Sequence, residues 1–255
     1  MRLVKVELSK DIENLDICIF SDEHIGDPRS NINYLKERIE YVKNNDNVYC
    51  VLGGDLIDNA TKTSISDTYS QNFNPQESMD YLVELFKPIK NKILAIVSGN
   101  HEARTYKKEG IDIMKNVAER LGLGNRYDFT SIYLFLRFGN CNKNRRQRYT
   151  IYLTHGSGGG RKEGAKAIRL ADLACICDAD VYIHNHTHLP MTMKEDFIRV
   201  SESTSTISTV TKLFVNSSAN LEYGGYGEAI GCKPASLIKP IIHLSGKVRE
   251  AKATL

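Results

Sequence analysis

Histidine and acidic residues gather in five short polar blocks, and each block directly follows an apolar run. The blocks are Phe20 to His24, Gly53 to Asn59, Gly99 to Glu102, Thr154 to Gly156 and His184 to His188. A single His or Asp at the end of a strand is usually a cap or a satisfied polar group. However, six of the seven histidines lie inside the blocks, and only His243 lies outside them. Because burying such groups is costly unless charge compensates them, the pattern indicates a site that binds something charged.

The side chains in the blocks are of the types that bind divalent metal ions. The candidate ligands are Asp22, His24, Asp55, Asn100, His155, His186 and His188. A closed structural zinc site uses four ligands, so seven are enough for two ions. The mixture of oxygen and nitrogen donors suits Mn²⁺, with Fe, Zn²⁺ or Ni²⁺ as alternatives, better than it suits Ca²⁺ or a thiolate-bound zinc.

The spacing of two ligand pairs suggests how they could chelate an ion. Asp22 and His24 are two positions apart, so both side chains would point to the same face of an extended strand end. His186 and His188 repeat this spacing. Asp55 has a carboxylate that could bridge two cations.

Apolar spacing predicts the elements that would position these blocks. Alternating or continuous apolar runs predict strands over 3–8, 15–20, 48–52, 93–97, 131–138, 149–153, 181–183, 197–200, 207–215 and 238–244. Apolar residues three and four apart predict helices over 32–42 and 79–86, and weaker ones over about 111–121 and 165–177. Asn74 is a candidate cap for the second helix, with Pro75 at its first position.

The order of these elements predicts an α/β fold. Strands alternate with helices over the first two-thirds of the chain, whereas the part after Pro190 is rich in strands and ends in a hairpin at Ser245 and Gly246. Carboxyl ends of strands in such sheets share one rim, so the polar blocks should converge there. We expect one domain over residues 1–255. Two long connections, 60–74 and 216–233, are candidates for functional loops.

Composition excludes several classes of protein. Apolar residues make up 41% and charged residues 25% of the chain, as in a globular protein outside the membrane. We predict no membrane span, no signal peptide and a cytoplasmic location. The six cysteines have no CxxC spacing and are expected to be reduced. The net charge of +3 lacks the concentrated basicity of a protein dedicated to nucleic acid.

The blocks resemble, in type and order, the signature of the calcineurin-like metallophosphoesterases, a family with a binuclear metal centre. That signature reads Asp-x-His, Gly-Asp-x-x-Asp, Gly-Asn-His-Glu, a single His and Gly-His-x-His, and it is matched here from Asp22 to His188. One departure is Asn185 in place of the last Gly, and Asn tolerates positive φ. The resemblance implies a four-layer αββα sandwich of two mixed β-sheets flanked by helices. It also implies one metal on Asp22, His24, Asp55 and His188, and a second on Asp55, Asn100, His155 and His186.

The resemblance further implies a mechanism of phosphoester hydrolysis. A hydroxide that bridges the two metals would attack phosphorus. His101 would protonate the leaving oxygen, and Asp58 would support its charged form. Arg104 and Arg161 flank the blocks and could contact the phosphate.

The substrate class depends on departures from one branch of the family. In the branch of the family that contains the protein Ser/Thr phosphatases, an Arg directly precedes Gly-Asn-His-Glu. A second Arg in that branch lies two positions before the last block's single ligand His. This chain has Ser98 and His184 there and keeps His188. We therefore favour a phosphodiesterase acting on a nucleotide or short nucleic acid. A phosphomonoesterase acting on proteins or small molecules is the alternative, and a non-catalytic metal-binding scaffold is less expected because every ligand is present.

Overall fold

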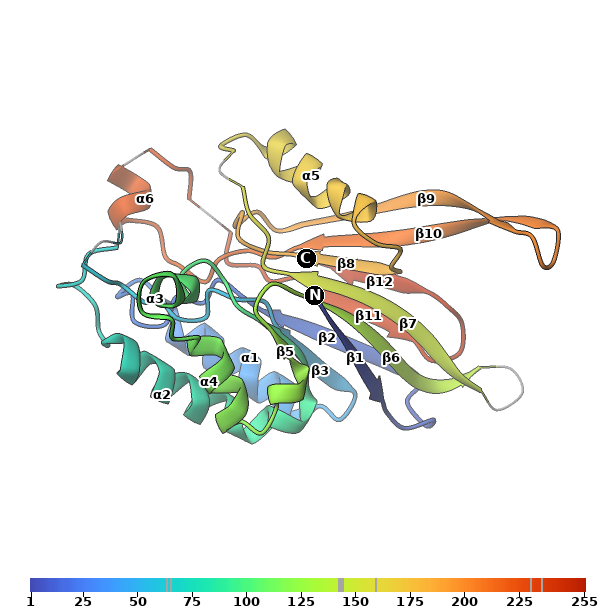
Figure 1. Ribbon diagram of the computed structural model, residues 1–255, viewed down its shortest axis with the longest axis horizontal. Helices are drawn as coiled ribbons and strands as arrows, with labels where there is room; N and C mark the ends of the chain where they lie inside the picture. The colour runs from blue at the N-terminus through green and yellow to red at the C-terminus, as the bar shows by residue number, and fades with distance from the viewer. Residues whose placement is uncertain (63, 65, 142–144, 159, 230, 235) are drawn as a thin grey trace.

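The protein folds into two six-stranded mixed sheets that face each other, with helices on the outside (Figure 1). The computed structural model describes residues 1–62, 64, 66–141, 145–158, 160–229, 231–234 and 236–255. The expected αββα sandwich is confirmed. The expected single domain stays a prediction. Within the described residues, no helix is long and apolar enough to cross a bilayer.

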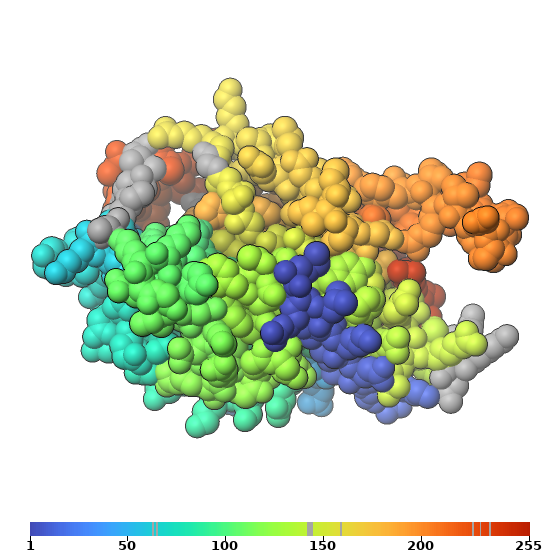
Figure 2. All heavy atoms as spheres, viewed as in Figure 1, coloured from blue at the N-terminus to red at the C-terminus, as the bar shows by residue number. Residues whose placement is uncertain are grey.

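Sheet A contains the first strand and the strands from the second half of the chain. Its order is β1 (Arg2–Glu7), β6 (Ser131–Cys141), β7 (Arg145–Thr154), β8 (Val181–His184), β10 (Thr206–Asn216) and β9 (Met191–Ser201). β1 is parallel to β6, and β8 is parallel to both β7 and β10. The β6/β7 and β9/β10 pairs are antiparallel. The β9–β10 hairpin projects from the body of the molecule (Figure 2).

Sheet B contains the strands that precede three of the polar blocks. Its order is β12 (Ala251–Thr254), β11 (Ile241–Ser245), β2 (Asn14–Phe20), β3 (Val48–Leu52), β4 (Ile93–Val97) and β5 (Tyr127–Asp128). The strands from β2 to β5 are parallel. β11 and β12 form the predicted C-terminal hairpin and add to β2 in antiparallel fashion. The parallel strands therefore present their carboxyl ends at one rim.

Helices cover the outer face of each sheet unequally. The helices are α1 (Ile32–Asn44), α2 (Pro75–Phe86), α3 (Glu102–Glu109), α4 (Ile113–Arg120), α5 (Glu163–Ala171) and α6 (Gly225–Ala229), with short 3₁₀ segments η1 (Lys87–Lys92), η2 (Gly124–Arg126) and η4 (Asp172–Cys175). α1, α2 and α4 pack on sheet B, whereas α5 and η4 cover part of sheet A (Figure 1). α2 begins as predicted, because Asn74 and Glu77 form a capping box.

The main core lies between the two sheets. Successive side chains of a strand point to opposite faces, so Ile17 and Ile19 of β2 pack against sheet A while Cys18 and Phe20 pack against the helices. All four side chains are buried. Cys18 and Cys50 are buried, and the six cysteines are free thiols, as expected. Because β2 is buried on both faces, its end is held rigidly.

α3 and β5 are among the elements that escaped the sequence-based prediction. α3 has the sequence EARTYKKE and buries only Glu102 and Ala103, so it has no apolar stripe that would predict a helix. β5 contains only two residues and is defined by its pairing with β4. β9 and β10 extend beyond their predicted apolar segments because the antiparallel ladder continues through polar residues. In each case tertiary contacts, rather than local pattern, form the element.

Candidate metal centre and catalytic site

The five polar blocks converge at the rim formed by the ends of β2, β3, β4, β7 and β8, as predicted. Backbone hydrogen bonds join the loops that carry them. The amide of Asp22 donates to Gly54 O at 2.9 Å, and the amide of His24 donates to Asp55 O at 3.1 Å. At the end of sheet A, the Asn185 amide after β8 donates to His155 O after β7 at 3.1 Å. The candidate ligands are thus held by a hydrogen-bonded framework.

The first cluster of candidate ligands contains Asp22, His24 and His188. One donor atom from each residue lies within 4.8 Å of the others. His188 Nε2 is 3.1 Å from Asp22 Oδ1. Asp22 and His24 are buried, and His24 Nε2 has no hydrogen-bond partner among the described residues. Buried polar atoms are normally paired, so this nitrogen fits a cation.

The second cluster contains Asp55, His155 and His186, again within 4.8 Å of one another. His155 Nε2 lies 3.2 Å from Asp55 Oδ2 and 3.1 Å from Asn100 Oδ1. His155 Nδ1 is 2.8 Å from Gly53 O, which fixes the ring so that Nε2 faces the cluster. Burial opposes protonation of His155, but the adjacent Asp55 carboxylate raises its pKa to about 10. At neutral pH His155 therefore carries a proton that a bound cation would displace.

The ligand loops adopt a conformation that differs from the prediction. Asp22 and His24 have φ values of 52° and 50°, and His186 and His188 have φ values of 65° and 55°. The expectation that an extended strand end aligns each pair is therefore wrong. Asp55 also has a positive φ, 49°. Non-glycine residues rarely adopt this left-handed conformation, and such strain persists only where surrounding structure enforces it.

Two glycines allow the loops to approach each other closely. A Cβ on Gly99 would lie 2.1 Å from Asp55 Oδ1, and a Cβ on Gly54 would lie 2.6 Å from the Gly99 nitrogen. Gly54 also has a positive φ of 86°. Any larger residue would push Asp55 away from the cluster.

Asn185, which replaces the last glycine of the family signature, is not among the residues with positive φ. Its side-chain amide donates a hydrogen bond to Thr154 O at 2.9 Å.

The buried Glu102 carboxylate connects the second and third polar blocks. It accepts hydrogen bonds from the amides of Asp55, Leu56 and Ile57 at 3.0, 2.7 and 3.2 Å, and from the Gly99 amide at 2.8 Å. These four donors compensate a charge that is otherwise costly to bury. Glu102 therefore contacts Asp55 through the Asp55 backbone amide.

A second buried charge network, which the sequence did not predict, lies under the first cluster. The Glu23 carboxylate lies 3.0 Å from Arg38 Nη1 and 3.6 Å from Lys239 Nζ. Lys239 also donates to Ser21 O at 2.6 Å. Burial lowers the pKa of Lys239 to about 8. No local signal at Lys239 could reveal this role, because Ser21 and Glu23 lie more than two hundred residues away in the sequence.

The sequence matches the family model for calcineurin-like phosphoesterases over residues 15–190. This chain belongs to the calcineurin-like phosphoesterase family. Most of its members are metal-dependent phosphoesterases. The matched segment contains all seven candidate ligands of this family member.

Solved structures similar to this calcineurin-like phosphoesterase have low sequence identity. A predicted phosphoesterase from Streptococcus pneumoniae TIGR4 is 13% identical, with a TM-score of 0.39 and coverage of 95% of this chain and 98% of that chain. A metallophosphoesterase from Sphaerobacter thermophilus is 15% identical, with a TM-score of 0.42 and coverage of 91% and 84%. Vps29 from Entamoeba histolytica in complex with Zn²⁺ is 12% identical, with a TM-score of 0.34 and coverage of 94% and 97%. A comparison with curated proteins found no match.

In this calcineurin-like phosphoesterase, His101 lies beside the clusters and contacts Asp58. His101 Nδ1 is 2.8 Å from Asp58 O and 3.0 Å from Asp58 Oδ1, and His101 Nε2 is 3.8 Å from Asp55 Oδ2. Burial opposes protonation, but Asp55 and Asp58 together raise the pKa of His101. Asp58 Oδ1 also lies 3.3 Å from His24 Nδ1. One carboxylate therefore orients both a candidate acid and a candidate ligand.

The two candidate phosphate-binding arginines of this family member are placed differently. Arg104 Nη1 donates to Asp58 O at 3.0 Å, and its Nη2 lies 2.9 Å from His101 Nε2. Arg104 therefore contacts Nε2, the ring nitrogen of His101 that faces Asp55. Arg161 is exposed before α5, and none of the hydrogen bonds or ion pairs among the described residues joins it to the clusters. Only Arg104 is brought to the site.

A cleft of about 460 Å³ opens next to the second cluster. Asn100 and His155 are among the residues that line it. Lys107 of α3 and Arg169 of α5 line its walls together with Phe129, whose ring lies 4.8 Å from that of Tyr106. The cleft thus combines cationic and aromatic side chains beside two candidate metal ligands.

Both long connections border the site of this family member. From the segment 60–74, Ser66 Oγ donates to Asp58 Oδ1 at 3.3 Å. From the segment 216–233, the Asn220 amide donates to Asp22 O at 2.8 Å. Residues 63, 65 and 230 of these connections lie outside the described residues. The first loop therefore contacts Asp58, the neighbour of His101, and the second contacts the candidate ligand Asp22.

Proposed function

We propose that this family member hydrolyses phosphodiesters and that its substrate is a nucleotide or a short nucleic acid. Asp22, His24 and His188, with Asp55 as a bridge, would hold one divalent ion. Asp55, Asn100, His155 and His186 would hold the other. Mn²⁺ is the proposed metal, with Fe, Zn²⁺ and Ni²⁺ as alternatives. When bound, the pair of cations would lower the pKa of water and polarise the phosphoryl group.

The protein's own residues would supply the remaining steps. Arg104 donates into the site and would bind a phosphoryl oxygen. Its guanidinium now lies at His101 Nε2, so a phosphate that draws Arg104 away would free this nitrogen to carry a proton. His101, held at Nδ1 by Asp58, would then donate that proton to the leaving oxygen.

The observation that carries the diester proposal is the cleft beside Asn100 and His155. A phosphomonoester has one substituent, whereas a diester has two, and the second needs its own space. The cleft provides about 460 Å³ next to the candidate metal ligands. Phe129 could stack on a base, and Lys107 and Arg169 suit an anionic neighbour.

A comparison of matched aryl phosphates tests this function. Metal-free protein is reloaded with Mn²⁺, Fe²⁺, Zn²⁺ or Ni²⁺ and assayed on bis-nitrophenyl and mono-nitrophenyl phosphate. We expect the diester to have the higher kcat/KM. A clear preference for the monoester, repeated on phosphopeptides, would favour a phosphomonoesterase, and no turnover with fully loaded metals would favour the scaffold.

The role of Asp55 is tested separately. Asp55→Asn keeps the shape of the side chain but removes the charge that both metals would share. We expect metal content and turnover to fall together, whereas the exposed control Asp46→Asn should retain both. Normal metal content in Asp55→Asn would contradict the proposed ligand set.

A further inference from the structure

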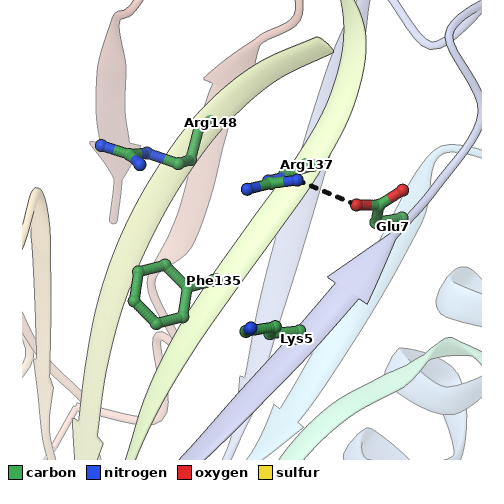
Figure 3. Close-up of a pocket in the computed structure, with 5 residues that line it drawn as sticks. All are labelled: Lys5, Glu7, Phe135, Arg137 and Arg148. Atoms are coloured by element: carbon green, nitrogen blue, oxygen red, sulfur yellow. Dashed lines mark hydrogen bonds and ion pairs between the residues drawn. The ribbon is translucent and has the colours of Figure 1, made fainter.

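The outer face of sheet A is covered by helix over only part of its width. α5 and η4 bury Tyr182 and Phe214, which point outward from β8 and β10. Toward the other edge, Lys5 of β1, Arg137 of β6 and Arg148 of β7 are exposed. Figure 3 shows these side chains on neighbouring strands around Phe135. This uncovered area is a continuous surface built from three strands.

We define the basic face as Lys5, Phe135, Arg137, Arg145, Arg146 and Arg148. A hollow of about 170 Å³ lies among Lys5, Glu7, Phe135, Arg137 and Arg148. A second, wider hollow adjoins it and is also lined by Arg145, Arg146 and Lys10. The strand ladder places Lys5 opposite Phe135, and Arg137 opposite both Glu7 and Arg148. β-pairing therefore assembles cations that are far apart in sequence.

Positive charge on this face exceeds what the fold requires. Among the described residues that line the two hollows, six are cationic and only Glu7 is anionic. Glu7 is engaged by Arg137 at 3.1 Å and by Arg146 at 3.6 Å. Arg137 and Arg148 stand directly opposite each other, and like charges in this position destabilise a sheet. The whole chain has a net charge of only +3, so its composition conceals a concentrated basic surface.

We propose that the basic face binds single-stranded nucleic acid, with phosphates at the cationic side chains and a base stacked on Phe135. Successive outward residues of a strand are about 7 Å apart, which is the expected separation of Arg146 and Arg148 along β7. Arg137 of β6 lies opposite Arg148. Phe135 is only half-buried, and its ring lies 5.2 Å from that of Tyr133. An aromatic ring among cations is the combination that binds single strands without sequence preference. An acidic peptide or an anionic membrane would bind to the cations, but neither would require the Phe135 ring among them.

The face and the metal centre share a strand. β7 carries Arg148 on the basic face and ends at Thr154, next to the candidate ligand His155. Six residues of strand span about 20 Å, so a strand of several nucleotides could touch both. Binding at this face does not depend on the proposed hydrolysis, and the two can fail separately.

Fluorescence anisotropy with a labelled short oligouridylate tests the proposal. The protein is kept metal-free with a chelator so that it cannot cleave the probe. We expect Lys5→Glu/Arg148→Glu to lower the affinity for the oligouridylate by at least about tenfold. The plot of log association constant against log salt concentration should become less steep, by roughly 0.7 for each phosphate that is no longer neutralised. Phe135→Ala should lower affinity by at least about fivefold while leaving the salt slope unchanged.

A charge-matched control separates the basic face from general electrostatics. Lys87 and Lys90 are exposed in η1, on the sheet B side of the sandwich. Lys87→Glu/Lys90→Glu changes net charge equally and should leave affinity within about twofold. An equal fall in affinity in this control would overturn the proposal.

Two further measurements complete the test. Circular dichroism should show that the variants remain folded, because every substituted side chain is at least partly exposed. Their hydrolysis of the bis-nitrophenyl ester should match that of the unsubstituted protein, whatever that rate is. Failure to bind the oligouridylate at low salt would overturn the proposal. Equally tight, Lys5- and Arg148-dependent binding of polyglutamate or phosphatidylserine vesicles would overturn it in favour of those partners.

Discussion

His101 Nδ1 lies 3.0 Å from the Asp58 carboxylate, which directs the opposite ring nitrogen toward Asp55. In the proposed mechanism, Nε2 is the nitrogen of His101 that would donate a proton to the leaving group. A proton donor matters most when the leaving oxygen is strongly basic. A nitrophenolate departs without a proton, whereas a ribose alkoxide requires one.

We therefore predict that His101→Ala loses at least roughly a hundredfold in kcat on an alkyl or nucleoside diester, and much less on a nitrophenyl diester. Metal content must be measured first, because an empty site would mimic the loss. His243→Ala is the matched control, since His243 pairs with Asp16 on sheet B. Equal losses on both substrates, with metals retained, would remove the general-acid role from His101.

Arg104 should tune the pH dependence of the reaction. Its charge beside His101 Nε2 lowers the pKa of His101, opposing Asp55 and Asp58. The protonated acid is lost as pH rises through this pKa, so Arg104→Met should move the alkaline limb of kcat/KM to higher pH. Removing the hydrogen bonds from the guanidinium to phosphate should reduce kcat/KM by about tenfold to a hundredfold. Arg120→Met on α4 serves as control, and an unchanged alkaline limb would show that Arg104 does not act on His101.

Metal uptake should release a proton from His155. In the metal-free protein Asp55 raises the pKa of His155 from 6.5 to about 10, so this imidazole is protonated throughout that window. His24 and His186 have lowered pKa values because of burial and are already neutral there. A ligating imidazole carries no proton at the coordinating nitrogen, so apparent affinity should rise with pH up to about 10.

Calorimetry in buffers of different ionisation enthalpy measures this release. On metal binding, we expect His155→Gln to release one proton fewer than the unsubstituted protein. His243→Gln should release the same number as the unsubstituted protein. If the unsubstituted protein takes up metal without releasing a proton in this range, the Asp55–His155 ion pair does not exist in solution.

Glu102 should support the metal centre without touching the metals. Glu102→Gln replaces one acceptor oxygen with an amide that faces backbone N–H groups. We expect unfolding free energy to fall by about 2 to 4 kcal/mol and metal affinity by about tenfold to a hundredfold. Glu109→Gln, at the exposed end of the same helix, should change neither. Unchanged metal affinity in a destabilised Glu102→Gln would limit Glu102 to a folding role.

Local pattern in the sequence determined which residues form the strands of the core and which residues gather at their ends. β3 and β4 are continuous apolar runs, and β2 becomes one from Ile17 to Phe20. The polar residues that follow these strands include Asp22, His24, Asp55 and Asn100. Such runs form buried strands because both faces must be removed from water. The order of the polar blocks along the chain can be read from the sequence alone. The family signature and the candidate ligands were therefore predictable without the structure.

Only tertiary structure decided the local geometry of the site and the charge of the surface. The left-handed backbone at Asp22 and His186 is maintained by hydrogen bonds from distant loops, so no local rule predicts it. Lys239 reaches Glu23 from the far end of the chain, and α3 is anchored through Glu102 rather than by an apolar stripe. The basic face likewise depends on the register of β1, β6 and β7. Electrostatic and backbone interactions between distant segments act through space, and a linear pattern records only the residues that take part.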